Sequence, residues 1–78
     1  MSEPYVPIAC ALHDEYEIAI MHKKHLRIKW SDDRGEQHTG DVLPKDILVK
    51  DKQEFLIAEV VGGEAICVRL DKITLLGS

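Results

Sequence analysis

The sequence contains no long apolar run, and its cysteines are few. No stretch of the 78-residue chain approaches the roughly 20 consecutive apolar residues that a membrane-spanning helix needs. The first residues also lack a basic segment followed by an apolar one, so we expect no secretory signal peptide. Cys10 and Cys67 are the only cysteines. Such usage is typical of free thiols in a reducing compartment. We therefore expect a cytoplasmic protein without membrane association.

The patterns that usually mark catalytic and metal sites are also missing. None of the serines lies in the G-x-S-x-G context of a nucleophile. Gly62-Gly63 is not followed by the lysine and hydroxyl residue of a phosphate-binding loop. His22 and His25, with His13 and Cys10 nearby in the sequence, match no zinc spacing and are expected to be surface residues. We therefore predict that the protein is not an enzyme and holds no cofactor or metal.

The net charge of −4 is concentrated at the N-terminal end. Residues 1–20 contain four acids and no lysine or arginine, whereas residues 21–78 contain ten acids and ten bases. A concentrated acidic segment can steer a basic partner. A chain of this size buries only about 60% of its unfolded surface. With a hydrophobic content of 45%, we expect residues 1–78 to form a single compact domain.

An amphipathic helix is predicted over residues 9–22. At about 100° per residue, its apolar side is formed by Leu12, Tyr16, Ala19 and Ile20. Asp14 and Glu17 lie on the opposite side, three positions apart, so their carboxylates project together. Glu15 flanks the apolar stripe, and His13 lies at its boundary. Acids in a first helical turn stabilise a helix through its dipole and need no partner, which is the simplest explanation for this face.

After the helix, the hydrophobic period changes from about 3.6 to 2. Leu26, Ile28 and Trp30 alternate with basic residues, as in a half-buried strand. Further strands are predicted over residues 37–49 (bent or bulged), 54–61 (buried on both faces), 65–70 and 73–76. With an extended lead-in over residues 1–8, the chain is predicted to be mainly β with one N-terminal helix. The expected architecture is a small Sm-like or OB-like open β-barrel of about five strands over residues 26–76.

Three separated motifs resemble those of a known family. Tyr5-x-Pro7-Ile8-x-Cys10 is similar to an N-terminal motif, and Asp14-x-x-Glu17-x-Ala19 to an acidic helix. Arg69–Thr74 (RLDKIT) is similar to a motif near the C-terminus. Through these motifs, residues 5–75 resemble the Rof (YaeO) family, small bacterial inhibitors of the transcription terminator Rho.

The resemblance implies an inhibitor that binds the N-terminal RNA-binding domain of Rho and keeps RNA from loading there. That domain uses a basic, aromatic cleft to capture pyrimidine-rich RNA. Asp14 and Glu17 carry over as contacts, because they match the family position for position. The full set of expected partner-binding residues is Asp14, Glu17, Glu15, His13, Tyr5, Lys50 and Lys52. We expect a monomer that does not itself bind nucleic acid.

Two other functions remain open. A basic stretch on a small barrel could track a phosphate backbone, which would make the chain an Sm-like RNA-binding protein. The residues involved would be Lys23, Lys24, Arg27, Lys29 and Arg69. Against this, Trp30 and Tyr16 follow the inward-facing patterns of their elements, so surface aromatics for base stacking are missing. The chain could also be an interaction module for a different basic protein.

Overall fold

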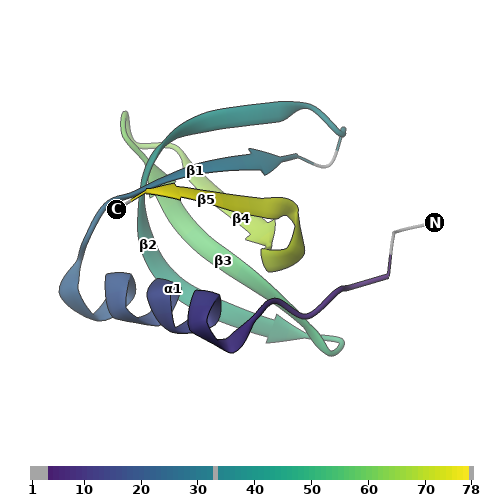
Figure 1. Ribbon diagram of the computed structural model, residues 1–78. Coiled ribbons are helices and arrows are strands. Elements are labelled where there is room, and N and C mark those ends of the chain that lie inside the picture. Colours follow the sequence, from purple (N-terminus) through teal and green to yellow (C-terminus); the bar gives the residue numbers. More distant parts are fainter. Residues whose placement is uncertain (1–3, 33, 78) are drawn as a thin grey trace.

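The computed structural model describes residues 4–32 and 34–77, and it is mainly β with one N-terminal helix, as predicted. The helix α1 spans Cys10–His22 and is followed by five strands and a short 3₁₀ turn. The strands are β1 (Leu26–Ser31), β2 (Gln37–Lys50), β3 (Gln53–Val60), β4 (Ala65–Arg69) and β5 (Ile73–Gly77), with the 3₁₀ turn η1 (Leu70–Lys72) before β5. Figure 1 shows the helix lying beside one strongly curved sheet.

All five strands belong to one antiparallel sheet with the order β4-β3-β2-β1-β5. The sheet curves but does not close into a barrel, because β4 and β5 remain its two edges. The long strand β2 pairs with β1 through its first half and with β3 through its second half. The register shifts between Pro44 and Asp46. This bulge confirms the bend expected in residues 37–49, and it lets one strand serve both halves of the sheet.

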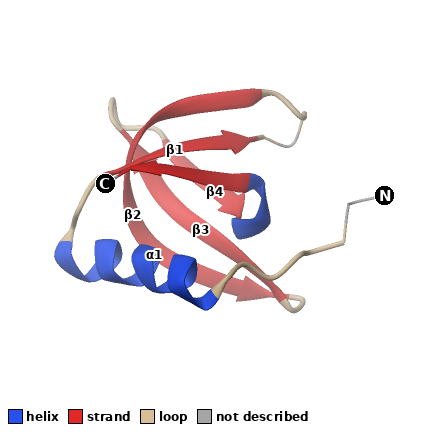
Figure 2. Cartoon of the chain, in the orientation of Figure 1, coloured by secondary structure: helices blue, strands red, loops and turns tan. Residues whose placement is uncertain are grey.

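The helix packs against β2, and Tyr16 and Ala19 are its buried residues. It ends at Lys23, which adopts a left-handed conformation (φ 53°), while the Lys24 N–H donates to the Ala19 carbonyl. This ending turns the chain into β1. The segment before the helix runs beside the turn between β2 and β3 (Figure 2), where the Tyr5 hydroxyl donates to Glu54. None of the helices formed by the described residues is long and apolar enough to cross a membrane.

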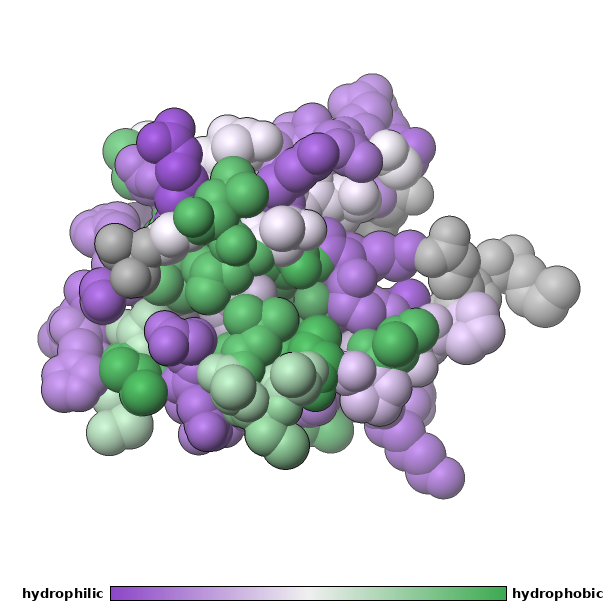
Figure 3. All heavy atoms as spheres, viewed as in Figure 1, coloured by the Kyte–Doolittle hydropathy of each residue, from purple (hydrophilic) through white to green (hydrophobic). Residues whose placement is uncertain are grey.

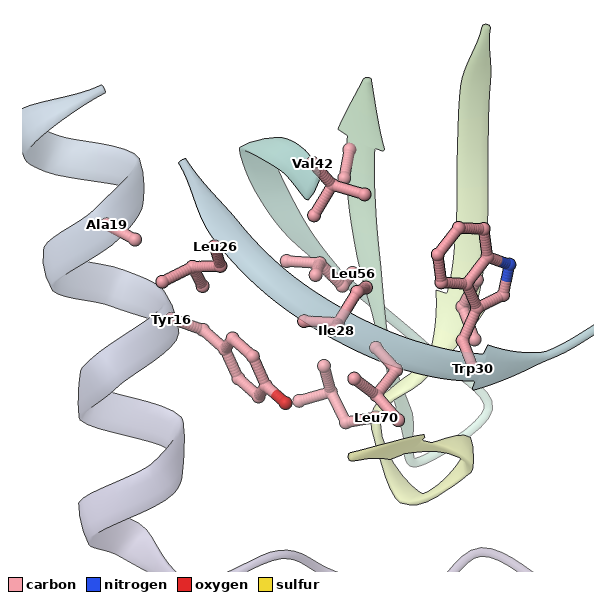
Figure 4. Packing of buried hydrophobic residues seen from close by; sticks show 11 residues of the cluster. Tyr16, Ala19, Leu26, Ile28, Trp30, Val42, Leu56 and Leu70 are labelled. Atoms are coloured by element: carbon pink, nitrogen blue, oxygen red, sulfur yellow. The ribbon is translucent and has the colours of Figure 1, made fainter. Parts of the chain in front are cut away.

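The core lies between the helix and the concave side of the sheet. The expected alternation in β1 is confirmed, because Leu26, Ile28 and Trp30 are buried and the residues between them are exposed. Figure 4 shows Tyr16 reaching from α1 into the cluster formed by the strands. The buried cluster contains Tyr16, Ala19, Leu26, Ile28, Trp30, Val42, Leu56, Ala58, Val68, Leu70 and Ile73.

One expectation about β3 is wrong. Its apolar run predicted burial on both faces, but only Leu56 and Ala58, on one face, are buried. Phe55 and Ile57, on the other face, are half-buried, and Val61 lies beyond the strand with 67% of its surface exposed. The sheet has a helix on one side only, so the second face of β3 remains partly in water.

The buried hydroxyl of Tyr16 provides a test of the packing. It has no hydrogen-bond partner among the described residues, and burial raises the pKa of Tyr16 to about 12. A buried unsatisfied polar group costs about 1–3 kcal/mol. We therefore expect Tyr16→Phe to raise the free energy of unfolding in urea by about 1 kcal/mol. A large decrease in stability would show instead that the hydroxyl has a partner in the folded protein.

Candidate partner-binding site

The acidic face predicted from the sequence is present on α1. Asp14, Glu15 and Glu17 are all exposed; Asp14 and Glu17 lie on the side of the helix away from its buried residues, and Glu15 flanks the buried side. Within residues 4–32 and 34–77, the side chains of Asp14 and Glu15 make no hydrogen bond or ion pair. Two of the three carboxylates are therefore not neutralised by a base in the described part of the chain, and they project from a rigid element.

The acidic residues of α1 do not lie in its first turn, where they would stabilise the helix through its dipole. The helix begins at Cys10, so its first turn contains no acidic residue, and Ala9 provides no side-chain cap. The interaction with the helix dipole falls off within the first turn. The expectation that these carboxylates mainly stabilise the helix start is therefore wrong, and their placement favours an outward role.

His13 connects the acidic face to the sheet. Its Nδ1 lies 2.6 Å from Glu17 Oε1, and its Nε2 lies 2.7 Å from Glu54 Oε2 on β3. A neutral imidazole has one N–H, so His13 donates hydrogen bonds to both carboxylates only when its ring is protonated. Glu17 is thereby fixed through His13 to a strand, whereas Asp14 is exposed, with a carboxylate oxygen within 4.8 Å of His13 and Glu17 but no hydrogen bond to either among the described residues.

Tyr5 is anchored in the same network. Its hydroxyl donates to Glu54 Oε1 over 3.3 Å, and the Arg69 guanidinium lies 5.8 Å from its ring centroid. Burial and the neighbouring Glu54 carboxylate raise the pKa of the Tyr5 hydroxyl. The ring is half-buried. Tyr5 is therefore held by contacts within the protein, and only part of its ring is accessible for the partner contact expected from the sequence.

A second cluster fastens the N-terminal segment to η1. Arg69 donates through Nε to Asp71 Oδ1 (2.6 Å) and through Nη2 to Asp71 Oδ2 (2.9 Å). The Val6 N–H donates to Asp71 Oδ2, and Arg69 Nη2 donates to the Pro4 carbonyl. Burial acts to raise the pKa of Asp71, but the hydrogen bonds from Arg69 and Val6 and the Arg69 charge hold it below its usual value.

Contacts thus run without interruption between residues of the three separated motifs. Asp71 binds Arg69, Arg69 lies over Tyr5, and Tyr5 binds Glu54. Glu54 in turn binds His13, which holds Glu17. Sequence reasoning did not single out Glu54 as part of this site. Its signal is weak, an acid next to the start of a mostly apolar strand.

Lys50 is the last residue of β2, Lys52 lies in the tight turn between β2 and β3, and both are exposed. Asp51 and Lys52 adopt positive φ angles of 52° and 62°, as a two-residue hairpin turn requires. Glu54, two residues further on, contacts His13, so this turn lies beside the start of the helix. Because the turn lies beside the helix, Lys50 and Lys52 could contact the same partner as the acidic face of α1. Their role stays a prediction.

Potential metal ligands do gather in two places, although not in the combination considered from the sequence. His13, Asp14 and Glu17 form one set, and Asp32, Glu36 and His38 form another. Among the described residues, neither set includes Cys10, His22 or His25. Asp32 is already engaged, because it accepts the Arg34 and Glu36 N–H groups and contacts His38. Exposed clusters of this kind are common without an ion, and we assign no metal to them.

The basic stretch is exposed but lacks aromatic support. Lys23, Lys24, Arg27 and Lys29 all face solvent. Trp30 is 8% exposed and stacks on His38, with ring centroids 5.4 Å apart. Across the sheet, Arg27 lies opposite Asp41. Within residues 4–32 and 34–77, no tryptophan, tyrosine or phenylalanine is fully exposed, which disfavours base stacking beside these charges.

The comparison with known families identifies the class to which this fold and site belong. Residues 7–78 match the model of a family described as modulator of Rho-dependent transcription termination (ROF). The match covers almost the whole chain, and the protein belongs to this ROF family. No curated protein matches the sequence significantly. The resemblance derived from the three motifs is therefore confirmed, and the protein is a modulator of Rho-dependent termination.

Proposed function

We propose that this protein is a non-enzymatic cytoplasmic inhibitor that binds the N-terminal RNA-binding domain of Rho as a monomer. In this proposal, the acidic face of α1 occupies a surface that otherwise binds RNA, and so prevents RNA from loading. Membership of a family that modulates Rho-dependent termination supports Rho as the partner. The observation that carries the proposal is the exposure of Asp14, Glu15 and Glu17 on one rigid helix.

The physical basis is competition between carboxylates and phosphates for the same cations. A protein surface that binds RNA presents lysine and arginine to the phosphate backbone. Each hydrogen bond from such a cation to a carboxylate contributes about 1.5–3 kcal/mol. Two or three of these, opposed by the entropy of association, are compatible with micromolar affinity or better. A helix presents them at low entropic cost, because their backbone positions are already fixed.

A competition experiment tests this function. A labelled pyrimidine-rich oligonucleotide is bound to Rho, and the protein is added in increasing amounts. We expect the oligonucleotide to be released, while the protein alone produces no gel shift with it. Direct binding of the oligonucleotide by the protein would instead favour the RNA-binding alternative, with Lys23–Lys29 as its surface. Failure to release RNA while capturing a different basic protein would favour a general interaction module.

A further inference from the structure

An open groove of about 340 Å³ lies between α1 and the second half of β2. Its apolar lining comes from Ile20 and Met21 on the helix and from Ile47 and Val49 on the strand. Met21 and Val49 are 75% and 65% exposed, so this lining is open to solvent. The groove also contains His13 and Glu17, so it adjoins the acidic face of α1. Figure 3, viewed from the helix side, shows apolar side chains gathered in a band from the start of α1 toward β5.

Apart from His13, the remaining lining of the groove is acidic. Glu17, Asp46 and Glu54 contribute carboxylates from α1, β2 and β3, and no lysine or arginine of the described chain lines the groove. Glu17 and Glu54 are close together, since both contact the ring of His13. Asp46 is exposed, and its Oδ1 accepts the N–H of Ile47. An apolar lining with three carboxylates fits a ligand with a hydrocarbon stem and a positive head.

We propose that this groove receives an arginine side chain from the RNA-binding surface of Rho. The inference rests on the proposed function, and it specifies which part of the partner enters which part of this protein. The arginine methylenes pack on Ile47 and Val49, and its guanidinium faces Glu17 and Asp46. Long cationic side chains commonly bury their stems while the head remains in a polar environment.

Charge and size favour arginine over other occupants. A neutral aromatic side chain would remove water from the carboxylates without replacing their hydrogen bonds, which is costly. Lysine would supply a point charge, whereas the planar guanidinium can bind two carboxylate oxygens at once. The volume lies near the lower end of small-ligand pockets, about 300–1,000 Å³, so one side chain fits better than a helix or strand.

Two substitutions and one matched control test the groove. Val49→Lys places a cation of the protein's own over the groove, at a position that is already 65% exposed. Val61→Lys is its control, because Val61 is 67% exposed and lies beyond the opposite end of β3. Asp46→Asn removes one carboxylate charge while its amide oxygen can still accept the Ile47 N–H. Affinity for the isolated Rho RNA-binding domain is measured by calorimetry, and folding by circular dichroism.

We expect Val49→Lys to weaken binding at least tenfold, the effect of losing one charge-assisted hydrogen bond. We expect Asp46→Asn to weaken binding about threefold or more, because its amide oxygen can still accept a hydrogen bond and only the charge is lost. Val61→Lys should bind nearly as wild type. If Val49→Lys and Val61→Lys weaken binding equally, the groove inference is overturned, because added positive charge anywhere on the surface would explain the result. If Val49→Lys weakens binding and Asp46→Asn leaves the affinity unchanged, the inference that the occupant is a cation is overturned. If neither groove variant weakens binding while Asp14→Lys does, the groove inference fails and the proposed function stands. If the wild type does not bind, the function itself fails.

Discussion

Replacing Asp14 by lysine is expected to raise the Kd for the RNA-binding domain of Rho about 10- to 100-fold, without unfolding the protein. Removing one charge-assisted hydrogen bond of about 1.5–3 kcal/mol corresponds to this range, and the new positive charge adds repulsion. Asp14 is the cleanest position for this test, because its side chain has no hydrogen bond or ion pair among the described residues. Glu17→Lys should act in the same direction, although it also breaks the contact with His13. Calorimetry provides the affinity in both cases.

A charge reversal at a distant site distinguishes the loss of a local contact from an effect of net charge on affinity. Glu64 is exposed and lies in the turn after β3, whereas the contact of β3 with the helix is made by Glu54 at the strand's other end. Glu64→Lys changes the net charge by the same amount and should leave the affinity nearly unchanged. Circular dichroism of all three variants should overlay that of the wild type. Normal binding by both Asp14→Lys and Glu17→Lys would show that this helix is not the contact surface.

The cluster that fastens the N-terminal segment should make a large contribution to stability. Asp71→Asn replaces the carboxylate that accepts hydrogen bonds from Arg69 Nε and Nη2, and it weakens the acceptor for the Val6 N–H. We expect a decrease in the free energy of unfolding of about 1.5–3 kcal/mol, the range for hydrogen bonds to charged groups. For a domain of this size, that corresponds to a fall in Tm of about 6–24 °C. Glu59→Gln is the control, because Glu59 is exposed on β3 and its side chain has no partner among the described residues.

The same cluster predicts a defined dependence on pH. The pKa of Asp71 is lowered in the folded protein from its ordinary value of 3.8. A carboxyl group with a lowered folded pKa contributes stability that is complete above its unfolded pKa and is lost as the pH falls through the folded pKa. The difference in Tm between wild type and Asp71→Asn should therefore be constant near neutral pH and shrink below 3.8. A difference that persists unchanged at pH values well below 3.8 would mean that the Asp71 charge is not its source.

Local patterns in the sequence predicted the elements but not their long-range contacts. The helix bounds differ from the expected 9–22 by one residue, and the alternation of Leu26, Ile28 and Trp30 identified the inward face of β1. These features follow from periods of about 3.6 and 2 residues. Burial of both faces of β3 was predicted wrongly, because an apolar run does not reveal whether a second layer covers it.

The network around the site could not be predicted from spacing. His13 and Glu54 are 41 positions apart, and Val6 and Asp71 are 65 positions apart. Only the antiparallel path of the sheet and the position of η1 bring these pairs together. The acidic residues of the helix were recognisable from sequence, but the groove beside them is lined by residues of α1, β2 and β3 that only the fold brings together.

The most direct test of the account is the RNA competition experiment, run at several salt concentrations with the wild type, Asp14→Lys and Glu64→Lys. Screening weakens attraction between exposed charges. The account predicts that the wild type and Glu64→Lys release RNA from Rho efficiently at low salt and less so as salt increases, whereas Asp14→Lys releases little at any concentration. Simultaneous binding of RNA and the wild-type protein to the RNA-binding domain of Rho, or equal release by all three proteins, would contradict it.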